Sequence, residues 1–227
     1  MSESAFRNEQ AKPRKGNGDG ARARGAAQGA AAGDKRERIL RAAVKVFARK
    51  GFHGARVAEV ARAAGVADGT IYLYFKNKED LLLQIFTDRL DGLLAQCRRS
   101  LGDEPTPEAR LRKIILLQLG LLEEHRDLAE VITVNIRQSK RILQTGTMPR
   151  FVEYLDTIAE VVAEGQAKGA LRKDVSPRVV ARSLFGALDG LTLTWALGRA
   201  EPGGLTRAAG QIADIFIEGL RVGPAAP

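Results

Sequence analysis

The stretch "GVADGTIYLYFKNKED", residues Gly65–Asp80, decides the fold of the first part of this chain. It follows the short apolar run "VAEVARAA". A helix-turn-helix unit needs a small residue where its two helices cross and a turn glycine whose backbone can become left-handed. Ala61 and Gly65 meet these needs, and four apolar residues can fill the interior: Val60, Ala64, Val66 and Ile71. The spacing therefore predicts a helix-turn-helix unit that starts at Val57.

The ring-bearing residues of the second predicted helix, "DGTIYLYF", divide between two faces. Ile71 and Phe75 are four residues apart, so they share one helix face and are predicted to enter the core. Tyr72 lies off that face, which leaves its hydroxyl able to reach a phosphate. Tyr74 is intermediate, with a ring that can close the core and a hydroxyl that can point outward.

Other residues around this helix are suited to contact nucleic acid. Gly69 lowers helix propensity by about 1 kcal/mol, a cost that makes sense where backbone and DNA approach closely. Thr70 can hydrogen-bond a phosphate or a base, and its methyl group can touch a thymine methyl. Lys76 and Lys78 can reach phosphates from the start of the next helix, which Asn77 is predicted to cap.

The net charge of +9 is concentrated near the N-terminus. Residues 34–80 contain eleven Lys and Arg against six Asp and Glu, whereas residues 81–227 contain nineteen against eighteen. This distribution indicates that the N-terminal third meets a polyanion, although a merely basic surface would have the same charge. The single Cys97 and the two histidines have no metal-ligand spacing. We therefore expect a cytoplasmic protein with no metal site, no cofactor and no catalytic residues.

Apolar periodicity predicts an all-α chain with two folded parts. The first helix should begin near Asp34 and stop at Gly51. Further helices are expected from Lys78 to about Arg99, after Pro107, and over about 148–168, 177–197 and 205–222. The β-branched run "VITV" is interpreted as helical because no partner strand is evident, and "IILLQLGLL" is too short to span a membrane. The expected segments are a flexible basic arm or disposable leader at 1–33, a DNA-binding domain at 34–81, a helical ligand-binding and dimerisation domain at 82–222, and a tail at 223–227.

Residues 35–81 resemble the DNA-binding domain of TetR-family transcriptional regulators, because "GVADGTIYLYFKNKEDL" follows the family signature almost residue for residue. The family often has Ser or Thr as the cap of the second helix. This chain has Arg56, which cannot accept a capping hydrogen bond but can bind a phosphate. The resemblance implies a homodimer on palindromic double-stranded DNA, with DNA contacts from Gly69, Thr70, Tyr72, Tyr74 and Lys78.

Two later segments, "IRQSK" and "FGALDGLTLTW", resemble the FadR-type branch of that family. Members of this branch repress fatty-acid degradation genes and are released by long-chain acyl-CoA. The resemblance implies an apolar pocket and dimerisation through the last two long helices. The candidate pocket residues are Phe86, Leu90, Leu119, Ile132, Asn135, Phe151, Leu155, Phe185, Leu188 and Trp195. Arg137, Lys140 and Arg141 share one side of a helix and could bind CoA phosphates, or form a solvated helix end.

Three other functions remain open on the sequence. A repressor of this kind could sense a different lipophilic compound, such as an efflux substrate, because apolarity does not identify a ligand. An enzyme acting on an acyl substrate is disfavoured because the chain has no nucleophile motif, phosphate loop or metal spacing. A sequence-neutral nucleoid protein is disfavoured because it would have no use for a pocket domain.

Overall fold

The computed structural model describes residues 19–138, 149–198 and 201–222. Helix α1 spans Asp19–Gly54, so it begins fifteen residues before the expected start at Asp34. The Ala-rich sequence upstream of Asp34 has high helix propensity, and adding turns to an existing helix is easier than nucleating one. Residues 19–33, which were expected to be part of a flexible arm, are helical in this structure. The chain up to Glu37 is a separate unit from the body that begins at Arg38.

The helix-turn-helix unit has the predicted construction. Helix α2 (Val57–Ala64) is followed by Gly65, whose φ of 65° and ψ of 40° are left-handed, and then by helix α3 (Asp68–Ile71). Gly51 is also left-handed in φ, at 69°, and interrupts α1 where the sequence predicted its end. Val60, Ala61, Ile71 and Phe75 are at most 2% exposed, as predicted, and Val46 and Phe47 of α1 join them in the interior. Ala64 and Val66, which were also predicted to fill the interior, are only partly buried.

Helix α4 (Lys78–Ser100) begins with two capping hydrogen bonds. The backbone N–H of Asp80 donates to Asn77 Oδ1 at 2.8 Å, and the backbone N–H of Lys76 donates to Asp80 Oδ2 at 2.8 Å. These contacts satisfy two backbone donors that the helix itself cannot satisfy. The cap fixes the start of α4 directly after the turn that carries Tyr72–Tyr74.

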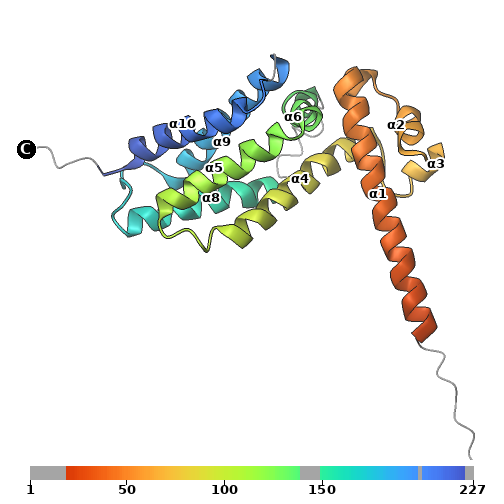
Figure 1. Cartoon of the computed structure of the whole chain (residues 1–227), viewed down its shortest axis with the longest axis horizontal. Helices are drawn as coiled ribbons and strands as arrows, with labels where there is room; N and C mark the ends of the chain where they lie inside the picture. Colours follow the sequence, from red (N-terminus) through yellow and green to blue (C-terminus); the bar gives the residue numbers. More distant parts are fainter. Residues whose placement is uncertain (1–18, 139–148, 199–200, 223–227) are drawn as a thin grey trace, which may run out of the picture. The chain divides into compact units, whose positions relative to one another are not determined.

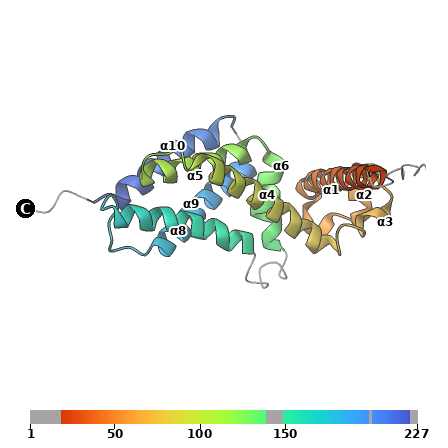
Figure 2. The same ribbon diagram turned by 90° about the horizontal axis from the view of Figure 1, so that it is seen from below.

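The remaining helices form the C-terminal part of the body (Figures 1 and 2). They are α5 (Pro107–Glu123), α6 (Arg126–Glu130), α8 (Pro149–Ala167), α9 (Pro177–Leu197) and α10 (Gly204–Leu220). In both views α5 lies beside α10, and α8 packs against α9. The described residues contain no β-strand, only an isolated bridge between Leu171 and Arg221, so the all-α prediction is confirmed. None of the helices in these ranges is both long and apolar enough to cross a membrane.

The segment after α6 departs from α-helical geometry. Residues Val131–Asn135 form one turn of π-helix, and Ile136–Gln138 continue as a 3₁₀ turn. The N–H of Ile136 bonds to the carbonyl of Val131, five residues earlier. The sequence prediction of a helix here was therefore right in kind, but the wider π turn rotates the residues that follow it. Such turns are rare and often occur at functional sites.

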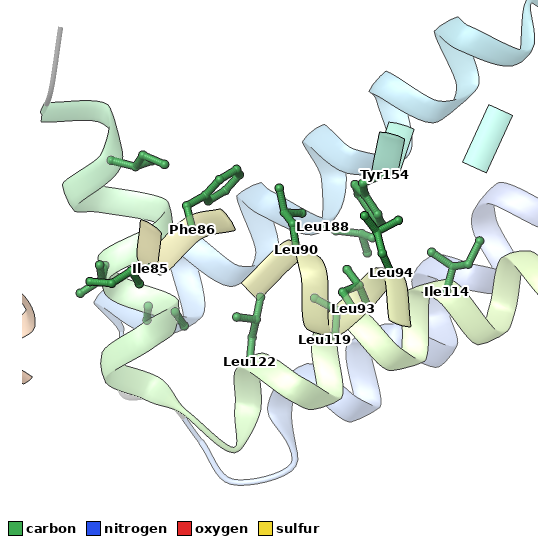
Figure 3. Close-up of a cluster of buried hydrophobic side chains, with 14 of the residues drawn as sticks. Ile85, Phe86, Leu90, Leu93, Leu94, Ile114, Leu119, Leu122, Tyr154 and Leu188 are labelled. Carbon is green, nitrogen blue, oxygen red and sulfur yellow. The ribbon is translucent and has the colours of Figure 1, made fainter. Parts of the chain in front are cut away.

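Apolar side chains from α4, α5, α8 and α9 meet in the core of this part (Figure 3). Leu119 and Leu188 are both 0% exposed, and Tyr154 is 1% exposed. Gly165 in α8 is required by the packing, because a β-carbon there would lie 2.5 Å from Leu171 Cδ1. Close packing of this kind leaves little free volume except where the site described below begins.

Candidate functional site

The first candidate surface is formed by α3 and the turn after it. Two neighbouring side chains protrude from the fold, since Tyr72 is 59% exposed and Leu73 is 81% exposed. Their neighbours Ile71 and Phe75 are 2% and 1% exposed, so the alternation between core and surface follows the predicted division by face. Tyr74 is half-buried, with its ring centroid 6.4 Å from that of Phe75. This surface presents one phenol and one aliphatic group side by side.

Helix α3 is shorter than the sequence predicted. Helix α3 contains four residues and ends at Ile71, whereas a helix reaching Phe75 was expected. The N–H groups of Leu73 and Tyr74 bond to the carbonyls of Thr70 and Ile71, three residues earlier, at 3.2 and 3.0 Å. This tighter turn projects Leu73 from the surface. Sequence reasoning missed Leu73, although its position between two core residues was the available signal.

Two residues proposed for DNA contact lie open on this surface. Gly69 is exposed, and Lys76 is exposed at the turn into α4. Thr70 is half-buried, with its N–H bonded to the carbonyl of Ala67 at 2.8 Å. Arg56 is exposed as the N-cap residue of α2, and its backbone N–H donates to Glu59 Oε2 at 3.1 Å. Glu59 thus supplies the acidic half of a capping box, in which its carboxylate binds the N–H of the N-cap residue.

Lys78 has a structural role that was not predicted. Its ammonium group donates to the carbonyl oxygens of His53 and Ala55, at 3.3 and 3.1 Å. It also lies 4.7 Å from the centroid of the Phe52 ring. A cation at the end of a helix satisfies carbonyls that have no partner within the helix. The phosphate contact of Lys78 stays a prediction, and the structure shows its ammonium group bound to carbonyls at the end of α1.

The second candidate site is a cavity of about 200 Å³ in the C-terminal part. Its aromatic lining comes from three helices: Phe86 of α4, Phe151 of α8 and Phe185 of α9. The ring centroid of Phe151 lies 6.2 Å from that of Phe86 and 4.8 Å from that of Phe185. Packed rings at these distances form a stable apolar wall. The cavity is therefore suited to a hydrocarbon group.

A few polar groups interrupt this apolar lining. Gln118 lines the cavity and accepts a hydrogen bond from the hydroxyl of Tyr154 through Oε1. Burial raises the pKa of Tyr154, so this phenol stays neutral and acts as a donor. Thr133 and Thr192 also line the cavity, but their hydroxyls donate to Ala129 and Leu188 within their own helices, at 2.7 and 2.8 Å. Binding a hydrocarbon would therefore leave few polar groups unpaired.

An ion pair lies at the polar end of the cavity lining. The guanidinium of Arg137 donates to Asp189 of α9 and to the backbone carbonyl of Thr133. The π turn and the 3₁₀ turn after it bring Ile132, Thr133, Ile136 and Arg137 to one wall of the cavity. The two basic residues grouped with Arg137 on the sequence, Lys140 and Arg141, lie outside the described residues. Only Arg137 of that cluster can be assigned a place.

A smaller cavity of about 40 Å³ shares five lining residues with the first: Phe86, Gln118, Leu122, Ile132 and Phe185. Leu90 lines this smaller cavity, together with Arg89 and Tyr154. Of the predicted pocket residues, Phe86, Leu90, Ile132, Arg137, Phe151 and Phe185 thus border one or both of these cavities.

Five predicted pocket residues do not border either cavity. Leu119 and Leu188 fill the helix interfaces, and Leu155 packs against the core. Asn135 is 1% exposed and lines neither cavity, and the indole N–H of Trp195 donates to the carbonyl of Glu201 at 3.2 Å. Helical periodicity identified these side chains as inward-facing but could not tell packed from open space. Conversely, Gln118 lines the cavity but was not predicted to do so. Its position within the apolar run "IILLQLGLL" was a signal for a buried polar contact.

Comparison with known proteins identifies the same two parts. Residues 39–85 match the family of bacterial regulatory proteins described as the tetR family, and residues 86–219 match the C-terminal region of YsiA-like proteins. The fatty acid metabolism regulator protein of Bacillus subtilis is 33% identical over 159 residues, which cover 70% of this chain and 82% of that protein.

Two solved structures have the same fold. The fatty acid degradation regulator FadR of Bacillus halodurans has a TM-score of 0.77 and 32% identity, over 82% of this chain and 96% of that one. FadR of Bacillus subtilis, solved in complex with stearoyl-CoA, has a TM-score of 0.76 and 29% identity, over 82% of this chain and 99% of that one. The FadR-type resemblance seen in the sequence is thus confirmed. The chain belongs to the TetR family of bacterial regulatory proteins.

Proposed function

We propose that this protein is a ligand-responsive transcriptional repressor that binds a palindromic operator as a homodimer and is released by long-chain fatty acyl-CoA. In the cytoplasm it would control genes of fatty-acid degradation. The observation that carries the effector assignment is the cavity walled by Phe86, Phe151 and Phe185, in which nearly every polar group already has a partner. The stearoyl-CoA complex of the Bacillus subtilis relative supports the same class of effector.

The size of the cavity supports a change of state on binding. Sites for drug-sized ligands commonly have volumes of about 300–1,000 Å³, and this cavity has about 200 Å³. A long acyl chain therefore requires an expanded form of the helical part. A ligand that fits only one form shifts the equilibrium toward it, and a hundredfold preference is worth about 2.7 kcal/mol.

Helix α4 supplies a route from this cavity to the DNA surface. Phe86 and Leu90 of α4 border the cavities, and the same helix starts at Lys78, next to the turn that carries Tyr72–Tyr74. Expansion around Phe86 would displace α4, and the capped start of α4 would move the recognition surface with it. In a dimer, such a movement changes the separation of two recognition surfaces, which must fit half-sites about 34–36 Å apart or a multiple of that distance.

The last two helices supply faces for the dimer. Leu197 of α9 and Ile215 of α10 are 64% and 66% exposed, and Val179 of α9 is also exposed. Exposed apolar side chains on two adjacent helices favour a self-complementary interface in which each copy offers the same patch. A dimer formed this way would present two copies of Tyr72 and Leu73 to DNA.

The test is release of a labelled operator, selected from random DNA by the purified protein and followed by fluorescence anisotropy. We expect stearoyl-CoA at micromolar, sub-micellar concentration to release the protein, while acetyl-CoA and free CoA do not. A scrambled duplex measures binding without sequence preference. The effector assignment is overturned if the operator stays bound at saturating stearoyl-CoA, and equal affinity for the scrambled duplex would overturn the repressor itself.

A further inference from the structure

Arg89 of α4 occupies an unusual position for an arginine. Its side chain borders the smaller apolar cavity, among Phe86, Leu90 and Leu122, and it also borders an open groove on the other side. The Nη2 atom is buried and has no hydrogen-bond partner among the described residues. Buried guanidinium groups normally have an anionic or carbonyl partner, because leaving one unpaired costs free energy. Within the described residues, Arg89 is therefore a buried cation with an unsatisfied guanidinium nitrogen.

The groove beside Arg89 has a volume of about 520 Å³. Its wall includes Arg41 and Lys45 of α1, together with His125 and Arg126 at the start of α6. Two acidic residues, Glu124 and Asp127, also border it. Arg126 donates to the carbonyls of Ala196 and Gly198 at the end of α9, at 3.2 and 3.1 Å. Basic groups outnumber acidic ones around this groove, which suits an anionic group.

Burial lowers the pKa of Arg89 to about 10, and the nearby carboxylate of Glu124 opposes that shift. A pKa of this value keeps the guanidinium charged near neutral pH. Glu124 supports the charge electrostatically but does not satisfy the buried Nη2 atom. A bidentate partner such as a carboxylate or a phosphate would satisfy both the charge and the hydrogen bond.

We propose that Arg89 binds the anionic head group of the effector, in the groove between α1, α4 and α6, while the apolar chain enters the phenylalanine-walled cavity. This inference rests on the proposed function, because it assumes an amphiphilic effector. The two cavities share Phe86 and Leu122, and Arg89 lines both the smaller cavity and the groove, so the smaller cavity adjoins the other two spaces. Carboxylate and phosphate head groups share the required chemistry.

The groove also touches the DNA-binding part directly. Arg41, Val44 and Lys45 belong to α1, the helix against which the helix-turn-helix unit packs. A head group held by Arg89 therefore contacts α1 and α4 at the same time. The head group, rather than the chain alone, would then favour one position of α1 relative to α4.

The test compares amphiphiles with one C18 chain and different head groups: stearoyl-CoA, the free carboxylate and the neutral alcohol, all below their micellar concentrations. The variants are Arg89→Met, which keeps an apolar side chain of similar length, and Arg89→Lys, which keeps the charge. Arg98→Met is the matched control, because Arg98 lies on the same helix but pairs with Glu153 at 3.0 Å, away from the groove. Each protein is measured by release from its operator and by the shift in melting temperature that the ligand produces.

We expect Arg89→Met to need at least about tenfold more of either anionic amphiphile than wild type, with no change for the alcohol and partial recovery in Arg89→Lys. Without ligand, Arg89→Met should melt no lower than wild type, because the substitution removes a buried charge and its unsatisfied guanidinium nitrogen. The inference is overturned if Arg89→Met and wild type respond equally to both anionic amphiphiles.

The two readouts separate this inference from the proposed function. An Arg89-dependent melting shift without any operator release in wild type would overturn the proposed function and leave the head-group site standing. If wild type and Arg89→Met are released from the operator at the same amphiphile concentration, the proposed function stands and the head-group site is overturned. If wild type shows neither release nor a melting shift with any of the three amphiphiles, both are overturned.

Discussion

Replacing Gly69 by alanine should improve folding and impair DNA binding. Gly69 is the second residue of α3 and is exposed, and a β-carbon added there meets no atom within 4 Å. Its backbone is helical, so alanine introduces no strain. Alanine is about 0.5–1 kcal/mol better than glycine in a helix. For a chain of this size that gain corresponds to a melting temperature about 1–4 °C higher.

The expected loss lies in the complex with DNA. Nothing packed around this exposed helical position requires a glycine. We therefore infer that the glycine allows the backbone of α3 to approach the operator closely. An added methyl group would then hold the two surfaces apart. We expect operator affinity to fall at least about tenfold, which is about 1.4 kcal/mol. Fluorescence anisotropy at fixed salt measures this affinity, since phosphate contacts make it salt-dependent.

Gly65→Ala is the control for a glycine retained for folding. Gly65 has a φ of 65°, and its surroundings are also open to a β-carbon. The left-handed backbone costs a non-glycine residue about 1–2 kcal/mol, so this variant should melt lower, in the opposite direction from Gly69→Ala. If Gly69→Ala binds the operator with wild-type affinity, the assignment of the α3 backbone to a close DNA approach is wrong.

Three further substitutions test individual contacts. Tyr72→Phe should weaken binding to operator and unrelated DNA by the same factor, because a phosphate contact carries no sequence information, and a loss confined to one base pair in a mutated-operator series would contradict that role. Lys78→Met should lower the melting temperature of the free protein, since it removes two hydrogen bonds to carbonyls at the end of α1. An unchanged melting temperature would show that these hydrogen bonds do not stabilise the fold. Glu123→Gln should destabilise the protein by about 1 kcal/mol, because the Glu123 carboxylate accepts hydrogen bonds from the N–H groups of Leu205 and Thr206, each at 3.1 Å. Burial opposes ionisation of Glu123, but these hydrogen bonds outweigh it and hold the pKa of Glu123 below its ordinary 4.5. The difference in stability between Glu123→Gln and wild type should therefore be full above pH 4.5 and disappear as the pH falls through the lowered pKa. A stability difference that persists in acid would show that the charge of Glu123 is not its cause.

The helix-turn-helix part was predictable because its rules are local. The left-handed conformation of Gly65 and the capping by Asn77 depend on residues within a few positions in the sequence. The same local rules located the helices at Pro107–Glu123 and Pro177–Leu197. Even here, the length of α3 was not predicted, because the helical spacing of Ile71 and Phe75 does not distinguish an α-helix from the three-residue hydrogen bonds found after Thr70.

The sequence predicted that the cavity is apolar but did not predict all of the residues that line it. Periodicity shows that Leu119 and Phe185 both face inward, but only the arrangement of four helices decides that one fills an interface and the other borders open space. The π turn at Val131–Asn135 changes which residues face the cavity and has no signature in a single sequence. Lys78 illustrates the same limit, because a lysine near a helix start can serve a phosphate or a neighbouring carbonyl.

The effector response of a variant with a filled cavity tests the central claim most directly. Thr192 is 0% exposed and borders the cavity, so Thr192→Phe places a ring in the proposed acyl site, whereas Thr192→Val keeps the volume and serves as the control. Both variants are titrated with stearoyl-CoA on the labelled operator. We predict that Thr192→Phe binds the operator but requires at least about tenfold more stearoyl-CoA for release, while Thr192→Val behaves like wild type. Release of Thr192→Phe at the wild-type concentration would contradict the assignment of this cavity as the effector site.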